Sequence, residues 1–574
     1  MNIFENYLAK IKELVLTNAN LLNINDTNKF KGITAENPPS NFDYEISCNI
    51  ALILAKTNKT NPKDLASKIK KLLSEEIKDF SKIDIAGPGF LNIKLSNVSL
   101  KKFVTEVIRT NKKYGSNNKK KKYNIEFVSA NPTGPMHVGH CRGAIFGDVL
   151  SNLLKFSGNT VTKEYYINDY GNQIKNFTKS VYLRIREIKY GEIFVNGENL
   201  YPGKYIIDIA NLIIKQNPEF NYDNFDLIYN SLSKESLRHS MNLIKNDLKE
   251  LGIKHDVFFS ETDLINKNLV ADSIGILKKK NFVIDGYLNP PKGEDIKNWK
   301  KTKRLIFKST LFGDDSDRAL KKNDDSWTYF ANDIAYHLDK VNRNYDHLIN
   351  ILGADHTGYI KRISAAVEAL SENKTKLSCK VCQLVKLYKN GTPFKMSKRA
   401  GDFISVRDLL KEVDKNSIRF MMLNRSNDVE LDFDFDKILE KSKDNPVFYV
   451  QYCYARISSL FKTANLKLSD TINTEDLDLN LNHFEYKIIR KIFDWPKVIE
   501  TSSNKYEPHR IPFYLYELST LFHSYWSKGN ESDEFKFVIN GKIKNQNTLA
   551  IIKLVSIVIE NGMGILGVSL PNKM

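Results

Sequence analysis

Apolar residues recur at helical spacing in three stretches of the first hundred residues, at 4–16, 50–56 and 62–71. Such spacing gives each segment one apolar stripe, so we expect three amphipathic helices. Residues 83–95 read IDIAGPGFLNIKL, in which Gly-Pro-Gly separates two runs rich in Ile and Leu. This pattern predicts two strands joined by a turn. Residues 1–112 are therefore expected to form an α+β domain.

A polar, lysine-rich stretch at 111–123 interrupts this pattern, and we expect 113–123 to be a solvated basic linker. It is followed by a strand candidate at 124–129, a turn rich in Pro and Gly, a helix over 140–158 and a strand over 161–169. This order predicts a Rossmann-like catalytic domain with a parallel sheet. Because 304–310 and 345–356 resume the α/β pattern, the domain is expected to span 124–394, with a more polar insertion at about 190–290.

From residue 446 to 574 the pattern is helical almost throughout, which predicts an all-α C-terminal helix bundle. Residues 395–445 would form a polar loop and a connecting stem. A chain of 574 residues is too long for one hydrophobic core. No run of about 18 apolar residues stands out, so we expect no membrane-spanning helix. The expected fold is a multidomain α/β protein.

The chain is basic, with 86 Lys and Arg against 68 Asp and Glu, a net charge of +18. This surplus favours an anionic partner such as RNA, but a composition rich in Lys, Asn and Ile explains it equally well. Five scattered cysteines indicate a reducing cytoplasm and no disulfide framework. Cys379 and Cys382 form an isolated CxxC that we interpret as buried strand residues, and we predict no structural metal.

The sequence ANPTGPMHVGH at 130–140 follows the first strand of the catalytic domain. Gly134 helps to break the strand into a turn, and Gly139 would let a ligand approach the backbone closely. The helix that follows offers N–H groups and a positive dipole end to phosphate. His137 and His140, three residues apart, share one face and can donate to phosphate oxygens. The alternative is a structural turn with two incidental histidines.

About 250 residues later the chain carries KMSKRAG at 395–401, whose two lysines suit a transient polyanion such as a triphosphate. Alone it would be a solvated basic turn. LGADHTGY at 352–359 follows an apolar run, and there Gly353 and His356 are candidates for contacts to a nucleotide. A tight turn under phosphates and a cationic loop over them predict that ATP activates a carboxylate.

The two strings resemble the HIGH and KMSKS signatures of class I aminoacyl-tRNA synthetases. The finer pattern resembles arginyl-tRNA synthetases over essentially the whole chain. It includes the lead-in at 126–132, WTYFANDIAYHLDK at 327–340, SKRAGDFISVRDL at 397–409 and DNPVFYVQYCYARI at 444–457. The resemblance implies an arginine–tRNA ligase that forms arginyl-adenylate from L-arginine and ATP and then transfers arginine to tRNA.

The resemblance also implies roles for particular residues. Glu126 and Asn131 would hold the ammonium and carboxylate ends of arginine. Tyr329 and Asp333 would hold its side chain; they lie four residues apart on a helical segment, so they face one way. A guanidinium needs carboxylate partners because its charge does not titrate away. The ATP loop would comprise four residues: Lys395, Met396, Ser397 and Lys398. Lys398 would stabilise the triphosphate, and Mg²⁺ would accompany ATP.

The family places contacts to the tRNA elbow in the first domain and anticodon contacts in the C-terminal helices. Aromatic and arginine side chains can stack on the bases of a single-stranded loop. The candidates there are Tyr449, Gln451, Tyr454 and Arg456. We expect Phe448 and Tyr452 to pack in the bundle core. We further expect a cytoplasmic monomer without membrane contact, in which arginine activation requires bound tRNA.

Three alternatives remain open from the sequence. The first is a class I synthetase for another amino acid, against which Tyr329 and Asp333 argue. The second is a non-enzymatic RNA-binding paralogue, against which the intact His137, His140 and Lys398 argue. The third is a small-molecule nucleotidylyltransferase, which shares the histidine turn but would not need the helices of 446–574.

Overall fold

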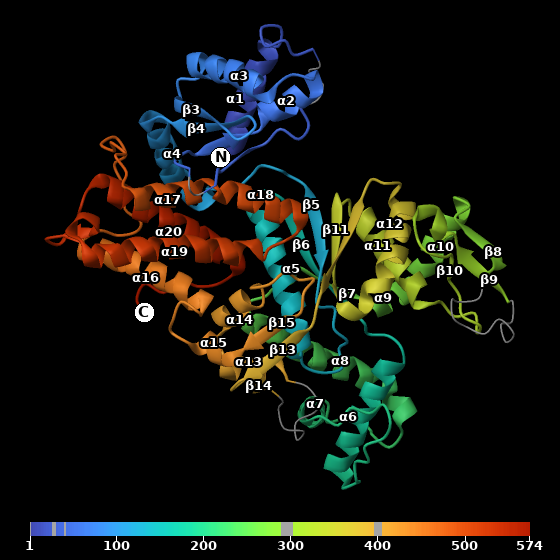
Figure 1. Ribbon diagram of the computed structural model, residues 1–574. Coiled ribbons are helices and arrows are strands. Elements are labelled where there is room, and N and C mark those ends of the chain that lie inside the picture. The colour runs from blue at the N-terminus through green and yellow to red at the C-terminus, as the bar shows by residue number, and fades with distance from the viewer. Residues whose placement is uncertain (1, 26–29, 40–41, 289–301, 395–403) are drawn as a thin grey trace. The chain divides into compact units, whose positions relative to one another are not determined.

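The computed structural model describes residues 2–25, 30–39, 42–288, 302–394 and 404–574 (Figure 1). The chain forms two compact units. Unit 1 contains Met1–Asn117, Lys441–Tyr506 and Arg510–Met574. Unit 2 contains Asn118–Glu440 and Glu507–His509.

Unit 2 is built around a five-stranded parallel sheet with the order β12-β11-β5-β6-β7. The strands are β5 (Lys122–Glu126), β6 (Thr160–Ile167), β7 (Val257–Ser260), β11 (His347–Gly353) and β12 (Lys376–Cys382). Helix α5 (Val138–Phe156) packs against β6 and β11. Strand order reverses between β5 and β11, and ligands of such sheets bind at the carboxyl ends of the strands beside this point. The predicted Rossmann-like fold is confirmed.

Two details of that prediction are wrong. Strand β7 belongs to the parallel sheet although it lies inside the segment expected to be inserted. Residues 304–310, expected to resume the α/β pattern as a strand, do contain a strand, β9 (Lys303–Phe307), but it lies outside the parallel sheet, in an antiparallel sheet with β8 (Val283–Tyr287) and β10 (Arg318–Ala319). Short strands of four or five residues carry too little periodicity to reveal their partner strand.

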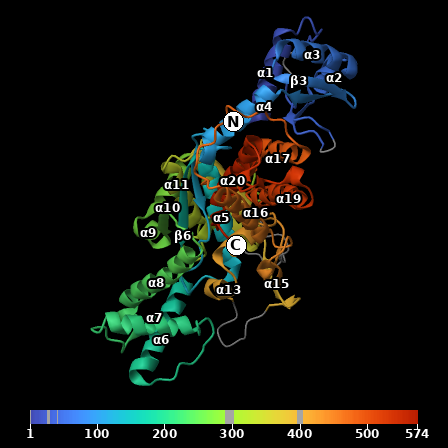
Figure 2. The same cartoon turned by 90° about the vertical axis from the view of Figure 1, so that its left-hand side faces the viewer.

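A helical module follows β6 and has a core of its own (Figure 2). It consists of α6 (Asn172–Tyr190), α7 (Lys204–Gln216) and α8 (Phe225–Glu250). Phe177, Ile209 and Leu232, one from each helix, lie within this core. The module is thus packed independently, and α8 then leads back to the central sheet at β7.

A second group of elements in unit 2 packs together around a shared apolar core. Its elements are α9 (Glu261–Asn266), α10 (Leu269–Lys279), η3 (Ser309–Phe312), α11 (Tyr329–Asn342), η4 (Ala354–Tyr359) and α12 (Ile360–Ser371). Phe330, Ile334 and Ile363 join α11 and α12 in one buried cluster. The rest of unit 2 comprises β13 (Val385–Lys389), β14 (Thr392–Pro393), α13 (Val406–Glu412), α14 (Lys415–Met421), β15 (Leu431–Asp434) and α15 (Phe435–Leu439).

The N-terminal part of unit 1 is an α+β fold whose antiparallel sheet has the order β1-β2-β4-β3. Its elements are α1 (Ile3–Thr17), β1 (Ala35–Glu36), β2 (Ile46–Cys48), α2 (Ile50–Asn58), α3 (Pro62–Glu76), β3 (Phe80–Ala86), β4 (Phe90–Leu95), α4 (Asn97–Thr110) and η1 (Asn111–Lys113). The three predicted helices and the predicted hairpin are confirmed.

The C-terminal part of unit 1 is helical apart from one small hairpin. Its elements are α16 (Pro446–Thr463), α17 (His483–Phe493), α18 (Trp495–Lys505), α19 (Arg510–Glu531), η6 (Asp533–Phe535), β16 (Val538–Ile539), β17 (Lys542–Ile543) and α20 (Gln546–Leu566). Among the described residues, α20 is long and apolar enough to cross a membrane, by length and composition only. However, 89% of its most apolar window is buried inside the bundle, as in the core helix of a globular domain.

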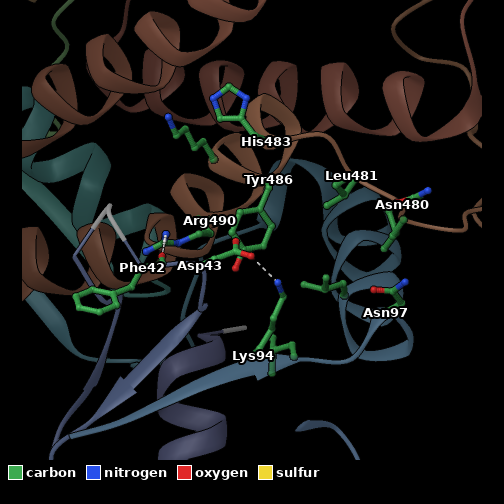
Figure 3. A pocket seen from close by; sticks show the side chains of 13 residues that line it. Phe42, Asp43, Lys94, Asn97, Asn480, Leu481, His483, Tyr486 and Arg490 are labelled. Carbon is green, nitrogen blue, oxygen red and sulfur yellow. Dashed lines mark hydrogen bonds and ion pairs between the residues drawn. The ribbon is translucent and has the colours of Figure 1, made fainter. Parts of the chain in front are cut away.

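The predicted linker is not fully solvated. Tyr114 is only 1% exposed, its hydroxyl donates to the Ile492 carbonyl, and its own carbonyl accepts from Trp495 Nε1. Gly115 has a φ of +91°, and a Cβ there would lie 2.6 Å from the Trp495 ring. Arg490 adds hydrogen bonds to the Pro38 and Phe42 carbonyls. Beside this contact lies a cavity of about 450 Å³, where Lys94 pairs with Asp43 (Figure 3).

Candidate active site

The turn after β5 has an unusual backbone. Val128 and Ser129 have φ values of 72° and 42°, in the left-handed region that a β-branched valine rarely adopts. Neighbouring groups hold the turn: Ser129 Oγ accepts from the Tyr166 N–H at 3.0 Å, and the Tyr165 hydroxyl donates to the Ala130 carbonyl at 2.7 Å. Strained backbone conformations that neighbouring groups hold in place are typical of functional sites.

The two histidines stack at the start of α5, with ring centroids 3.7 Å apart. His137 Nδ1 accepts from the Gly139 N–H, and His140 Nδ1 accepts from the His137 N–H. Burial lowers the pKa of His137, and burial together with His137 lowers the pKa of His140 to about 3. Both rings are therefore neutral at pH 7 and carry their proton on Nε2, so each can donate one hydrogen bond.

At both glycines of this turn a side chain would clash with a neighbouring ring, which the sequence did not show. A Cβ on Gly139 would lie 2.8 Å from the His137 ring, so glycine lets the two histidines stack. A Cβ on Gly134 would lie 2.9 Å from the ring of Tyr205 on α7. Both positions therefore serve close internal packing, in addition to any approach by a ligand.

The histidine turn pairs with the segment that follows the lysine loop. The Val138 N–H donates to the Ile404 carbonyl at 2.8 Å, and the Val406 N–H donates to the Met136 carbonyl at 3.0 Å. Between them His137 and Ser405 form an antiparallel bridge. The loop residues themselves, Lys395, Met396, Ser397 and Lys398, lie outside the described residues. The pairing places 404–406, which follow the second motif in the sequence, beside the histidine turn.

Glu126, at the end of β5, is held by a buried lysine. Lys340 Nζ lies 2.6 Å from Glu126 Oε2, and the lysine side chain is 0% exposed. The same ammonium is 3.4 Å from Asn350 Oδ1 and 4.2 Å from the Tyr336 ring centroid. Asn131 is exposed and donates to Gln173 Oε1 at 2.6 Å. Of the two residues, Glu126 is the one built into a rigid network.

Asp333, on α11, faces other carboxylates. It is half-buried and accepts a hydrogen bond from the Tyr359 hydroxyl. Burial raises its pKa to about 7. The Tyr359 hydrogen bond and the charge of Lys340 lower the pKa, whereas the charges of Glu126 and Glu261 raise it. Tyr329 begins α11, is 71% exposed and has Lys322 Nζ 5.3 Å from its ring. A cationic ligand at Asp333 would relieve the carboxylate repulsion.

Glu261 was missed by the sequence analysis. It is 5% exposed at the start of α9 and accepts from Asn332 Nδ2 at 3.0 Å. Burial raises its pKa, with a smaller contribution from Asp169. The only signal in the sequence was an acid directly after the short run VFFS, which is β7. This strand was not recognised, because it lies inside the segment expected to be an insertion. Glu126, Glu261 and Asp333 are called the carboxylate cluster below.

Gly353 is the last residue of β11, and His356 lies in η4, which follows directly. His356 is exposed, and its Nε2 is 3.4 Å from Asp355 Oδ2. Both residues are open to a ligand beside the point where strand order reverses. Among the described residues no group of three or more His, Cys, Asp or Glu is arranged to hold a metal ion.

A separate set of candidates lies on α16 and α19 of unit 1. Arg456 stacks on Tyr452 with 4.2 Å to the ring centroid, and its Nη1 is 3.0 Å from His523 Nδ1. Tyr449 packs on His523 at 4.3 Å between ring centroids. Phe448 and Tyr452 are only half-buried, so the expectation of core packing is wrong. These residues, Phe448, Tyr449, Tyr452, Arg456 and His523, are called the aromatic patch below.

The two other candidates on α16 have internal partners. Tyr454 is 8% exposed and its hydroxyl donates to Glu560 at 2.7 Å, so it has little surface to offer a base. Gln451 is half-buried and donates to the Ser569 carbonyl at 2.9 Å. We therefore leave Tyr454 out of the RNA-binding surface proposed below.

Three family models match the chain. They are the "Arginyl tRNA synthetase N terminal domain" at residues 5–95, the "tRNA synthetases class I (R), catalytic domain" at 103–190 and the "DALR anticodon binding domain" at 450–574. Curated relatives named arginine–tRNA ligase include that of Pelagibacter ubique, 54% identical, and that of Roseobacter denitrificans, 42% identical. Each match covers 100% of both chains.

Solved structures of arginyl-tRNA synthetases are also similar to this chain. A putative arginyl-tRNA synthetase from Campylobacter jejuni is 31% identical, with a TM-score of 0.73 over 84% of this chain and 100% of that one. The Thermus thermophilus arginyl-tRNA synthetase is 17% identical, with a TM-score of 0.72 over 100% of both chains. At that identity the second match supports the fold alone.

Proposed function

This chain belongs to the arginyl-tRNA synthetase family, and on that premise we propose that it joins L-arginine to its cognate tRNA. In the first step the arginine carboxylate attacks the α-phosphorus of ATP, giving arginyl-adenylate and pyrophosphate. In the second step the terminal ribose hydroxyl of the tRNA attacks the adenylate carbonyl, and AMP leaves. No side chain needs to form a covalent bond, so catalysis rests on positioning and on electrostatic stabilisation.

The carboxylate cluster is the observation that carries this proposal. Arginine has a permanent guanidinium charge and an ammonium group, and the cluster offers three carboxylates against the single ammonium of Lys340. We assign Asp333 and Glu261 to the guanidinium, with Tyr329 beside it. Glu126 takes the ammonium and Asn131 the carboxylate. Lys340 holds the Glu126 carboxylate in place before the substrate arrives.

ATP is assigned to the histidine turn. The Nε2–H groups of His137 and His140 can donate to phosphate oxygens and to charge developing at the α-phosphorus. Gly134, Gly139, Gly353 and His356 are assigned to the nucleotide from the sequence pattern, and Lys398 to the triphosphate, with Lys395, Met396 and Ser397 in the same loop. Mg²⁺ would arrive bound to ATP, because it is usually held by substrate phosphates and waters rather than by a cage of protein ligands.

The tRNA is assigned to unit 1. Residues 1–112 would contact the tRNA elbow and residues 446–574 the anticodon, with 113–123 as the link and 395–445 as loop and stem. The aromatic patch supports this role, because half-buried aromatic and arginine side chains can stack on unpaired bases. Gln451 lies on the same helix. We place the enzyme in the cytoplasm as a monomer.

Arginine-dependent ATP–pyrophosphate exchange, measured with and without tRNA, tests this function. We expect exchange with arginine, none with lysine or glutamate, and a requirement for bound tRNA. Formation of arginyl-tRNA should then follow. Exchange driven best by another amino acid would move the protein to a different specificity, and activity that survives deletion of 446–574 would favour a small-molecule nucleotidylyltransferase. A folded protein that forms no aminoacyl-tRNA would not be a ligase.

A further inference from the structure

Asp247 is a fully buried carboxylate near the end of α8 that the proposed reaction does not use. Its side chain is 0% exposed. One carboxylate oxygen accepts the Met136 N–H at 2.9 Å, and the other accepts Arg407 Nε at 3.0 Å. Three segments far apart in the sequence therefore meet at one side chain.

Both partners of Asp247 adjoin the two motifs of the ATP site. Met136 directly precedes His137, and Arg407 follows the segment that pairs with the histidine turn. That pairing consists of two backbone hydrogen bonds, Val138 N–H to the Ile404 carbonyl and Val406 N–H to the Met136 carbonyl. Asp247 thus contacts both paired segments: it accepts the Met136 N–H from the histidine turn and the Arg407 side chain from the segment paired with it.

The burial of this charge needs an explanation. Burial raises the pKa of Asp247, while the Met136 N–H and Arg407 lower it, so removal from water is only partly offset. The helical module of α6, α7 and α8 does not depend on the contact, because it has its own apolar core. Arg407 is half-exposed, and among the described residues Asp247 is the hydrogen-bond partner shown for its guanidinium.

We propose that Asp247 is a positioning residue for the use of ATP. It holds the Met136 N–H and Arg407 together, so that the turn carrying His137 and His140 stays in register with 404–406. This inference rests on the proposed function, and it makes the helical module part of the catalytic apparatus.

Three variants separate the two bonds. Asp247→Asn keeps the volume and an oxygen for the Met136 N–H but loses the ion pair. Arg407→Gln loses the pair from the other side, and Asp247→Ala loses both bonds. We expect kcat/KM for ATP to fall about tenfold in the first two variants and roughly a hundredfold in Asp247→Ala, since small displacements of reacting groups have effects of that size. KM for arginine should stay within about twofold.

The matched control is Asp256→Asn. Asp256 also accepts a backbone N–H, that of Lys163 at 2.9 Å, but it does not contact the histidine turn. It should leave kcat/KM for ATP unchanged. Adding Arg407→Gln to Asp247→Ala should cause no further loss, because the pair is already broken. Asp247→Asn is the conservative variant, and it should retain more activity than Asp247→Ala because it keeps the bond to the Met136 N–H.

Hydrogen exchange gives a readout independent of activity. In Asp247→Ala, peptides covering 136–140 and 404–408 should both exchange faster, while those of α6 and α7 keep their protection. The proposal is overturned if the variants bind and use ATP like the unsubstituted enzyme, or if KM for arginine rises as much as KM for ATP. An unsubstituted enzyme that makes no arginyl-tRNA would instead overturn the proposed function.

Discussion

The carboxylate cluster and the aromatic patch use opposite physical strategies. The cluster contains three acids, one of which, Glu126, pairs with a fully buried lysine, and burial raises the pKa values of Asp333 and Glu261. The patch is half-buried apart from the buried His523, and its one permanent charge, Arg456, lies over the Tyr452 ring. Charge that is buried and in excess favours a small cationic ligand strongly, whereas exposed stacking favours flexible bases weakly and with tolerance.

The contrast follows from what each site would bind. Arginine is small and carries fixed charge, so a rigid low-dielectric pocket can match it donor by donor and reject analogues that lack a partner. An RNA loop changes shape on binding, and stacking surfaces tolerate that change. Substitutions should therefore cost much more in the cluster than in the patch, and each should change the KM of only one substrate.

The largest effect is expected for Asp333→Asn. Removing a carboxylate from a buried cluster takes away one of the two charged partners assigned to the guanidinium, so kcat/KM for arginine should fall roughly a thousandfold, about 4 kcal/mol. KM for tRNA should not change. Aminoacylation kinetics at varied arginine and tRNA measure both. Asp339→Asn is the control, since Asp339 lies on the same helix but pairs with Arg343 at 3.0 Å. Equal losses in the two variants would contradict the assignment.

Arg456→Gln should weaken the binding of tRNA, the other large effect that we expect. Its side chain stacks on Tyr452 and also lies 4.8 Å from the Trp526 ring, so its loss disturbs two stacking surfaces. Stacking contributes about 1–3 kcal/mol per base, and we expect KM for tRNA to rise roughly tenfold to thirtyfold. Arginine affinity should stay constant. Filter binding of cognate tRNA checks the change directly, and unchanged binding would remove the patch from the RNA surface.

The pH dependence of arginine binding should expose the cluster. The pKa of Asp333 in the empty site is raised to about 7, so the carboxyl is ionised above that pH and protonated below it. A guanidinium needs the ionised form, so KM for arginine should rise about tenfold between pH 8 and pH 6. The Asp333→Asn variant should lose this dependence. A flat profile in the unsubstituted enzyme would show that Asp333 is ionised throughout.

The smallest effect is expected for Tyr454→Phe. Its hydroxyl donates to Glu560 inside the bundle, so the change should reduce stability by about 1 kcal/mol. KM for tRNA should stay within about twofold because the ring has little exposed surface. Thermal unfolding and tRNA binding measured side by side test both statements. A marked loss of tRNA binding without loss of stability would return Tyr454 to the RNA surface.

Much of the fold could be read from residue patterns. Helices at α1, α3 and α5 and strands at β4, β6 and β11 were predictable because each spans several periods of its pattern. Strand β7 was not, because four residues do not define a period. Glu261 was missed with it. The direction of β9 was also hidden, since a short apolar run looks the same in a parallel or an antiparallel sheet.

The sequence by itself indicated the chemistry of the protein: the histidine turn and the lysine loop point to activation of a carboxylate by ATP. The resemblance to arginyl-tRNA synthetases added Glu126 and Asp333 as expected partners of a cationic amino acid. Only the tertiary structure decided which groups meet. Pairing of 136–138 with 404–406, the Lys340 partner of Glu126 and the burial of Asp247 depend on contacts between segments separated by more than a hundred residues. Local patterns record how one segment folds, whereas such contacts arise from packing between segments.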